Sequence, residues 1–188
     1  MSVRNVVFSL PNLISLGRLF AVPVTVWLIL SGAMLVAFWL FVAACISDAA
    51  DGFIAKRFHA ETRIGSYLDP LADKALLVSV FITLGQAGYL ATWLVILVVF
   101  RDLLILVGAY LFHMLTQNLT PQPLWISKIN TAVQFTLAAA VLGFSGFGHG
   151  HGVLVEALVY LTAATTVASG GTYVVKWSRY AMAMERAN

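Results

Sequence analysis

Six apolar segments, each long enough to cross a bilayer as a helix, fill most of this 188-residue chain. A spanning helix needs about 20 apolar residues. The chain is 61% hydrophobic and only 10% charged, whereas soluble domains carry about 25% charged residues. We therefore predict an all-α, polytopic membrane protein with six transmembrane helices, a short N-terminal juxtamembrane segment and a single domain over residues 1–188. The predicted spans are Leu13–Leu30, Met34–Phe58, Ser66–Gly88, Thr92–Leu115, Ile126–Phe144 and Val153–Trp177.

Lysines and arginines fall on one side of this arrangement. The N-terminal side of the predicted bundle holds Arg4, the basic stretch 56–63, Lys128 and Lys176. The turns on the opposite side contain no lysine or arginine. Because positive loops stay in the cytoplasm, we expect both termini to be cytoplasmic. With no evident presequence, we expect a bacterial inner membrane.

Four aspartates lie where the second and third predicted helices are joined. Asp48 and Asp51 are three residues apart, and Asp69 and Asp73 are four apart, so each pair shares one helix face. A short connection makes the two helices antiparallel neighbours. Carboxylates in a membrane are costly, at about 2.5–3.5 kcal/mol each near its centre. Such an arrangement predicts a functional site at the cytoplasmic ends of these helices.

The aspartates offer only oxygen ligands, with no histidine or cysteine suited to join them. Hard oxygen donors favour Mg²⁺, Mn²⁺ or Ca²⁺. A metal pair can bind a pyrophosphate and stabilise both the attacking and the leaving oxygen. Salt bridges from the aspartates to Lys74 and Arg101 are the structural alternative.

The spacing Asp48-x₂-Asp51-Gly52-x₂-Ala55-Lys56-x₈-Gly65-x₃-Asp69-x₃-Asp73 resembles the signature of the CDP-alcohol phosphotransferase family. The family usually has arginine after the alanine, so either Lys56 or Arg57 contacts the substrate phosphates. The resemblance implies that Asp48, Asp51 and Asp69 bind metal around the CDP pyrophosphate. It implies that Asp73 removes the proton of the acceptor hydroxyl and also touches metal.

Further expectations follow from this resemblance. It implies two Mg²⁺ or Mn²⁺ ions and a homodimer. It also implies a site for the CDP-linked lipid, and the candidate residues are Asn12, Arg18, Asp51, Gly52, Ala55, Lys56, Arg57 and Gly65. For Asn12 and Arg18 the alternatives are helix capping and anchoring at the membrane interface.

Two short runs resemble the cardiolipin synthase branch of that family. They are Phe100-Arg101-Asp102 and Ser127-Lys128-Ile129-Asn130-Thr131-Ala132-Val133-Gln134. The resemblance implies transfer of a phosphatidyl group from CDP-diacylglycerol to phosphatidylglycerol, giving cardiolipin and CMP. The alternative is a phosphatidylglycerophosphate synthase, with glycerol 3-phosphate as acceptor.

Four residues are candidates for acceptor binding: Arg101, Ser127, Lys128 and Asn130. An intramembrane arginine is a functional candidate by default, but Arg101 has the alternative of a salt bridge to Asp102 or to the aspartate cluster. Ser127, Asn130 and Gln134 share one helix face and have the alternative of hydrogen bonding between helices. We expect the lipid substrates and the membrane as partners, and no nucleic acid.

An ion-coupled transporter is the rival class of function. Transporters often carry internal repeats with matching broken helices. Here the acidic cluster occurs once and at one interface, which favours an enzyme.

Overall fold

A computed structural model describes residues 10–58, 65–116, 125–150 and 152–185. Within these ranges the chain forms six helices and no strand, which confirms the all-α prediction for the described residues. Each helix starts and ends close to the bounds predicted from hydropathy, except that the last continues beyond Trp177. The helices are α2 (Leu10–Leu30), α3 (Met34–Phe58), α4 (Gly65–Gln86), α5 (Thr92–Thr116), α6 (Trp125–Gly146) and α7 (Val153–Glu185).

Helices α2, α4 and α6 end in the same way. A glycine with positive φ follows each: Gly32 at 77°, Gly88 at 80° and Gly148 at 71°. After α2, the amide of Ala33 donates to the carbonyl of Leu28 at 2.9 Å, the long bond of a Schellman motif. The equivalent bonds join Tyr89 to Leu84 and His149 to Phe144. Glycine tolerates this backbone conformation, so the glycine-containing turns fix where these helices stop.

The chain forms two compact units. The first comprises Met1–Leu90 and Ala138–His151, and the second comprises Ala91–Leu137 and Gly152–Asn188. Helix α6 therefore contributes its first half to the second unit and its second half to the first. The prediction of a single domain stays a prediction.

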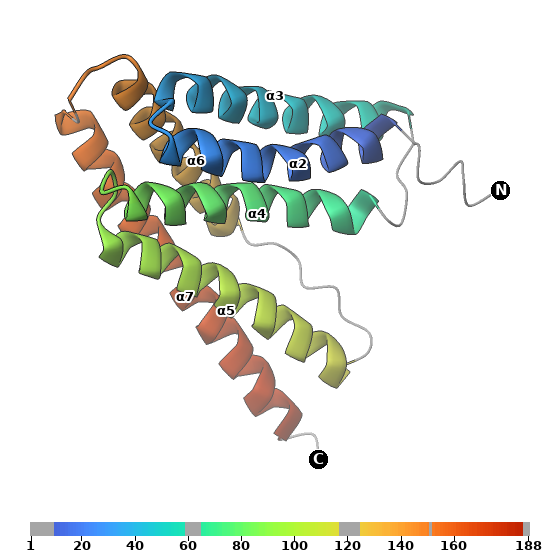
Figure 1. Ribbon diagram of the computed structural model, residues 1–188. Coiled ribbons are helices and arrows are strands. Elements are labelled where there is room, and N and C mark those ends of the chain that lie inside the picture. Colours follow the sequence, from blue (N-terminus) through green and yellow to red (C-terminus); the bar gives the residue numbers. More distant parts are fainter. Residues whose placement is uncertain (1–9, 59–64, 117–124, 151, 186–188) are drawn as a thin grey trace. The chain divides into compact units, whose positions relative to one another are not determined.

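In the first unit, α2 packs against both α3 and α4 (Figure 1). Its core includes Phe41 of α3 with Leu76, Val80 and Leu84 of α4, all buried. Helices α3 and α4 run in opposite directions, so the end of α3 and the starts of α2 and α4 lie at one end of the unit (Figure 1). The sequence predicted direct contact between α3 and α4. Among the described residues, the main contacts of each are with α2.

The second half of α6 completes the first unit by a close approach to α3. A Cβ atom at Gly146 would lie 2.7 Å from the Cα of Leu35 and 2.8 Å from its amide nitrogen. Such distances leave room only for glycine, because backbone atoms cannot turn aside as side chains do. Gly143, one turn earlier, faces the ring of Phe38, with 3.2 Å between the ring and an added Cβ.

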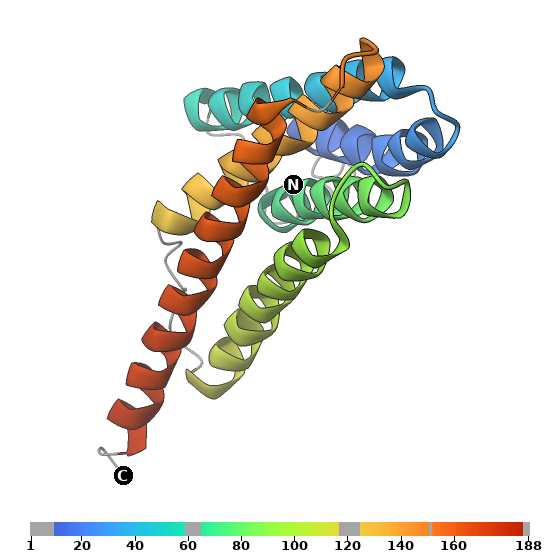
Figure 2. The same cartoon turned by 90° about the vertical axis from the view of Figure 1, so that its left-hand side faces the viewer.

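In the second unit, α5 and α7 lie side by side (Figure 2). Gly108 of α5 receives the ring of Trp177 from α7, and a Cβ added there would overlap the ring. Trp177 in turn contacts Tyr173, with 5.6 Å between ring centroids.

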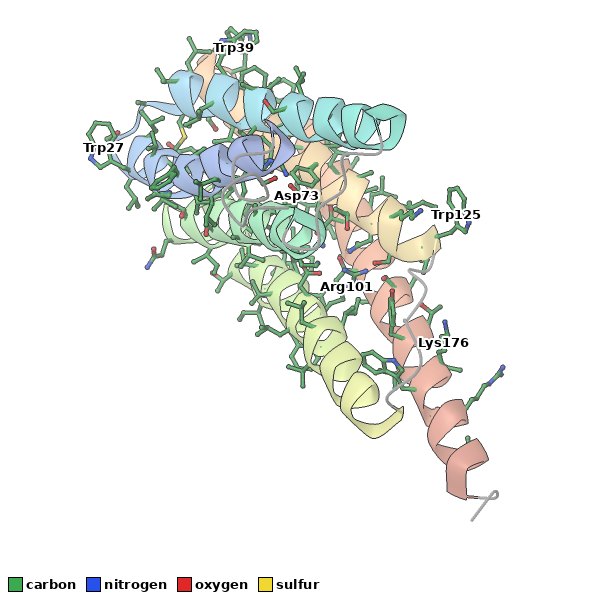
Figure 3. All side chains as sticks on the ribbon, turned by 90° about the vertical axis from the view of Figure 1, so that its right-hand side faces the viewer. Trp27, Trp39, Asp73, Arg101, Trp125 and Lys176 are labelled. Carbon is green, nitrogen blue, oxygen red and sulfur yellow. The ribbon has the colours of Figure 1, made fainter. Side chains whose placement is uncertain are left out.

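Large apolar side chains cover much of the exposed helix surface. Trp27, Trp39 and Trp125 point outward (Figure 3), and Trp125 is 78% exposed. In the described residues, Trp125–Gly146 and Val153–Arg179 are each long and apolar enough to span a membrane, and Ser15–Leu30 and Met34–Ser47 are shorter apolar helices. Six spanning helices therefore remain a prediction.

Candidate functional site

The backbone brings the four aspartates to one end of the first unit. Asp48 and Asp51 lie in the last turns of α3, and Asp69 and Asp73 lie in the first turns of α4. Both stretches are continuous helix, so each pair shares a helix face. The antiparallel course of α3 and α4 then places both pairs at the same end (Figure 1). Of the four side chains, only that of Asp73 lies within the described part of the structure.

Asp73 is held by an arginine from another helix. Nη1 of Arg18, on α2, donates to Oδ1 of Asp73. The Arg18 side chain is 2% exposed, whereas that of Asp73 remains 28% exposed. Arg18 is therefore a buried ion-pair partner rather than a side chain exposed at an interface. Its carboxylate partner is still accessible from outside the protein.

Helix packing explains why these two residues meet. Ser15, Arg18 and Thr25 are buried positions of α2, and α2 packs against α4. On α4, Asp73 follows the buried Ala72 and precedes the buried Leu76. The sequence did not predict the pair, since 55 positions separate its members. A charged residue inside an apolar helix was the available signal.

The other residues predicted to bind the CDP-linked lipid gather at the same end by their backbone positions. Asn12 lies in the first turn of α2, Gly52 and Ala55 lie near the end of α3, and Gly65 begins α4. Lys56 and Arg57 occupy the last turn of α3. Apart from Arg18, the side chains of this set lie outside the described residues, so these assignments stay predictions.

The donor atoms near this end suit a hard divalent cation. Carboxylate oxygens are the ligands that Mg²⁺ and Mn²⁺ prefer. Within the described side chains, no three histidine, cysteine or acidic residues are placed to hold a metal ion. The side chains of Asp48, Asp51 and Asp69 do not belong to this described set. The four carboxylates thus fit a divalent metal by the chemistry of their donor atoms.

A second polar cluster surrounds Arg101 in the second unit. This side chain is 3% exposed. Its Nη1 donates to Oδ1 of Asp102 at 2.6 Å. Its Nη2 donates to the hydroxyl of Ser127 at 2.7 Å and to that of Ser169 on α7. The salt bridge to Asp102, one of the two alternatives for Arg101, is therefore present, and Arg101 and Ser127 lie together.

Asn130 joins α6 to α7 in the same unit. Its Oδ1 accepts hydrogen bonds from the hydroxyls of Thr165 and Thr166, both at 2.9 Å. Hydrogen bonding between helices, the alternative for this face of α6, is thus present at Asn130. Sequence reasoning missed Ser169 and the two threonines, although the spacing of Thr162, Thr166 and Ser169 follows one helix face.

Lys128 lies apart from these buried side chains. It is exposed, and its Nζ is 5.1 Å from the ring centroid of Trp125. Ser127 and Asn130, by contrast, contact the interior of the second unit. Among the four acceptor candidates, the structure thus brings together Arg101 and Ser127, with Asn130 one turn further along α6.

The chain can be compared with known proteins. Residues 8–168 match the CDP-alcohol phosphatidyltransferase family. A chloroplastic CDP-diacylglycerol–glycerol-3-phosphate 3-phosphatidyltransferase 1 of Oryza sativa is 37% identical over 93% of this chain and 58% of its own length. A CMP-forming cardiolipin synthase of Rattus norvegicus is 34% identical over 88% of this chain and 60% of its own length.

A further relative comes from Mycobacterium tuberculosis. It is named a probable phosphatidylglycerophosphate synthase and is 33% identical over 92% of this chain and 83% of its own length. The chain therefore spans most of this bacterial relative, but only 58% and 60% of the rice and rat proteins. Relatives of both activities match nearly the whole chain. The match over residues 8–168 shows that the chain belongs to the CDP-alcohol phosphatidyltransferase family.

Proposed function

We propose that the chain transfers a phosphatidyl group from CDP-diacylglycerol to phosphatidylglycerol, forming cardiolipin and releasing CMP. The observation that carries the donor half is the Asp48–Asp73 spacing at one end of the first unit, in a member of this family. The acceptor half is supported by the runs at Phe100–Asp102 and Ser127–Gln134. The name of the rat relative also supports it.

The second candidate is a phosphatidylglycerophosphate synthase, which would use the same donor with glycerol 3-phosphate. The names of the rice and mycobacterial relatives favour this acceptor. Both reactions make and break the same kinds of bond. They differ only in what is attached to the acceptor glycerol.

Asp48, Asp51 and Asp69, with Asp73 as a further ligand, would hold two Mg²⁺ or Mn²⁺ ions. A bound metal would neutralise the pyrophosphate and stabilise the leaving CMP. The protein would contribute orientation: Gly52, Ala55 and Gly65 allow a substrate to approach the backbone closely. Lys56 or Arg57, with Asn12, Arg18 and Asp51, would bind the CDP-linked lipid.

Asp73 would act as the general base. The acceptor hydroxyl oxygen attacks the phosphorus on the lipid side, a new P–O bond forms, and the P–O bond to CMP breaks. The proton of the hydroxyl passes to the Asp73 carboxylate. An ion pair with Arg18 restricts the orientation of this carboxylate, and a positioned base is more effective than a mobile one. The exposed fraction of 28% leaves the carboxylate open to a substrate.

The acceptor would bind at Arg101, Ser127 and Asn130, with Lys128 at the surface. The protein would lie in a bacterial inner membrane as six spanning helices and a homodimer, with both termini and the aspartates on the cytoplasmic side. Its many exposed apolar side chains support contact with lipid, because soluble monomers rarely expose large contiguous apolar surfaces.

Product identification tests this proposal. Purified protein in detergent receives CDP-diacylglycerol, Mg²⁺ and either phosphatidylglycerol or glycerol 3-phosphate. Released CMP is quantified and the lipid product is identified by mass spectrometry. We expect cardiolipin from phosphatidylglycerol, and no CMP when EDTA replaces Mg²⁺. A product from glycerol 3-phosphate alone would establish the second candidate, and no CMP from either acceptor would refute both.

A further inference from the structure

A line of buried polar side chains joins α6 to α7 within the second unit. Ser127 of α6 and Ser169 of α7 accept hydrogen bonds from the same nitrogen of Arg101. Three residues further along α6, Asn130 bonds to Thr166, which lies three residues back along α7. The two helices therefore run antiparallel in a constant register. One more turn in each direction places Gln134 of α6 opposite Thr162 of α7.

This next level of the line has unmet hydrogen-bonding capacity. Asn130, Gln134 and Thr162 are each 0% exposed. The amide nitrogen of Asn130, both amide atoms of Gln134 and the hydroxyl of Thr162 have no hydrogen-bond partner among the described residues. Buried polar atoms are almost always paired, and leaving one unpaired is costly. These four atoms lie at two adjacent levels of the line, where a polar ligand could pair with them.

Neighbouring threonine hydroxyls, unlike that of Thr162, are paired with the backbone of their own helix. Thr131, Thr136 and Thr165 donate to backbone carbonyls four residues earlier in their own helices. Thr162 makes no such bond. Its hydroxyl can therefore serve a ligand, as can the amide of Gln134.

The chemistry of this level favours a neutral ligand with adjacent hydroxyl groups. The charge of Arg101 is already matched by Asp102, and Ser127 lies seven residues before Gln134, or about 10 Å along the helix. An amide with both atoms unpaired can accept from one hydroxyl and donate to another. Either orientation of the Gln134 amide serves this purpose, so the assignment of its oxygen and nitrogen does not matter.

We infer that Gln134, Thr162 and the amide nitrogen of Asn130 form a subsite for the vicinal diol of the acceptor glycerol. This inference rests on the proposed function and applies to both acceptor candidates, since each carries a glycerol with two neighbouring free hydroxyls. One hydroxyl donates to the carbonyl oxygen of Gln134. The neighbouring hydroxyl accepts from the Gln134 amide nitrogen.

Steady-state kinetics of Gln134→Leu and Thr162→Val test the subsite. Both replacements keep the approximate side-chain volume and remove hydrogen bonding. The matched controls are Gln86→Leu, at the exposed end of α4, and Thr136→Val, at an exposed position of α6. We expect the KM for the acceptor to rise about tenfold in each test variant, the effect of losing one or two hydrogen bonds to a substrate. The KM for CDP-diacylglycerol should stay within twofold, and both controls should match the wild type.

An acceptor analogue sharpens the test. A phosphatidyl-1,3-propanediol lacks the secondary hydroxyl of phosphatidylglycerol. The analogue of glycerol 3-phosphate is the monophosphate of 1,3-propanediol. The wild type should prefer the diol acceptor by about tenfold in kcat/KM, and Gln134→Leu should lose this preference. A variant that merely weakens folding would lower activity with both acceptors equally.

The outcomes separate this inference from the proposed function. No CMP release by the wild type with either acceptor would refute the proposed function and the subsite with it. An active wild type whose acceptor KM and diol preference are unchanged in both Gln134→Leu and Thr162→Val would overturn the subsite alone. The polar line would then hold water or only join the two helices.

Discussion

Two buried arginines, one in each unit, solve the same electrostatic problem differently. Arg18 pairs with an acid on another helix, and that acid is 28% exposed. Arg101 pairs with the next residue in the chain, Asp102, which is 3% exposed, and adds two serine hydroxyls. The Asp102 carboxylate is closed off from a substrate, whereas the Asp73 carboxylate is open to one. The difference teaches that the two pairs are distinguished by the accessibility of the acid rather than by burial of the arginine, and the proposed function assigns the reactive role to the accessible acid.

The largest expected effect on stability lies at Arg101. Arg101→Met removes the guanidinium from the buried Asp102 carboxylate. Losing one partner of a buried pair costs about 3–5 kcal/mol, so the free energy of unfolding in detergent should fall by that amount. The double variant Arg101→Met/Asp102→Leu should recover most of the loss, because an apolar pair leaves no unmatched charge. Equal destabilisation of the single and double variants would show that Asp102 does not depend on Arg101.

A smaller loss of stability is expected at Arg18. Arg18→Gln leaves Asp73 with access to water, so the free energy of unfolding should fall by only about 2 kcal/mol. The rate of CMP release should fall more than this loss of stability explains, because the proposed base, Asp73, is no longer held. Arg18→Lys is the matched control, which keeps the charge and should recover part of kcat. A destabilisation as large as that of Arg101→Met would erase the distinction between the two pairs.

Each unit also has a glycine where two helices approach closely, and replacing these two glycines gives the next comparison. Gly146→Ala in the first unit would press a methyl group against the backbone of Leu35, at 2.7 Å. Overpacking that side chains cannot relieve costs about 1–3 kcal/mol, measured as a lower free energy of unfolding. Unchanged stability would mean that α6 and α3 are not this close.

The smallest effect is expected at Gly108 in the second unit. There the obstacle is the far end of the Trp177 side chain, which can turn aside. Gly108→Ala should lower the free energy of unfolding by about 1 kcal/mol and shift the tryptophan fluorescence. The shift should disappear in a Trp177→Phe background. A larger loss than that of Gly146→Ala would reverse the predicted ranking.

Hydropathy and turn chemistry predicted the helices well, and for a physical reason. Long apolar segments leave few alternatives to helices, and the turns at Gly32, Gly88 and Gly148 supply positive φ. The spacing of the four aspartates likewise predicted that the end of α3 and the start of α4 lie at one end of the first unit. Both patterns involve residues that are close in the sequence, so they can be interpreted without knowing the tertiary fold.

Contacts between distant residues could not be read in the same way. The pairing of Arg18 with Asp73 depends on which face of α2 meets α4, and both helices are apolar on most faces. The partners of Asn130 depend on the register of α6 against α7. Hydroxyl side chains in an apolar helix usually bond to their own backbone, as Thr136 does, so the sequence did not distinguish Thr166 as a partner between helices.

The most direct test of the account is CMP release by the wild type and by Asp73→Asn, alongside Asp102→Asn. A general base contributes about 10²–10⁴ to a rate. We predict that Asp73→Asn loses turnover by at least about a hundredfold, more than its loss of stability explains, while its binding of CDP-diacylglycerol stays near that of the wild type. Asp102→Asn should lower the unfolding temperature, while its turnover falls no more than its loss of stability explains. Wild-type turnover in Asp73→Asn would contradict the account.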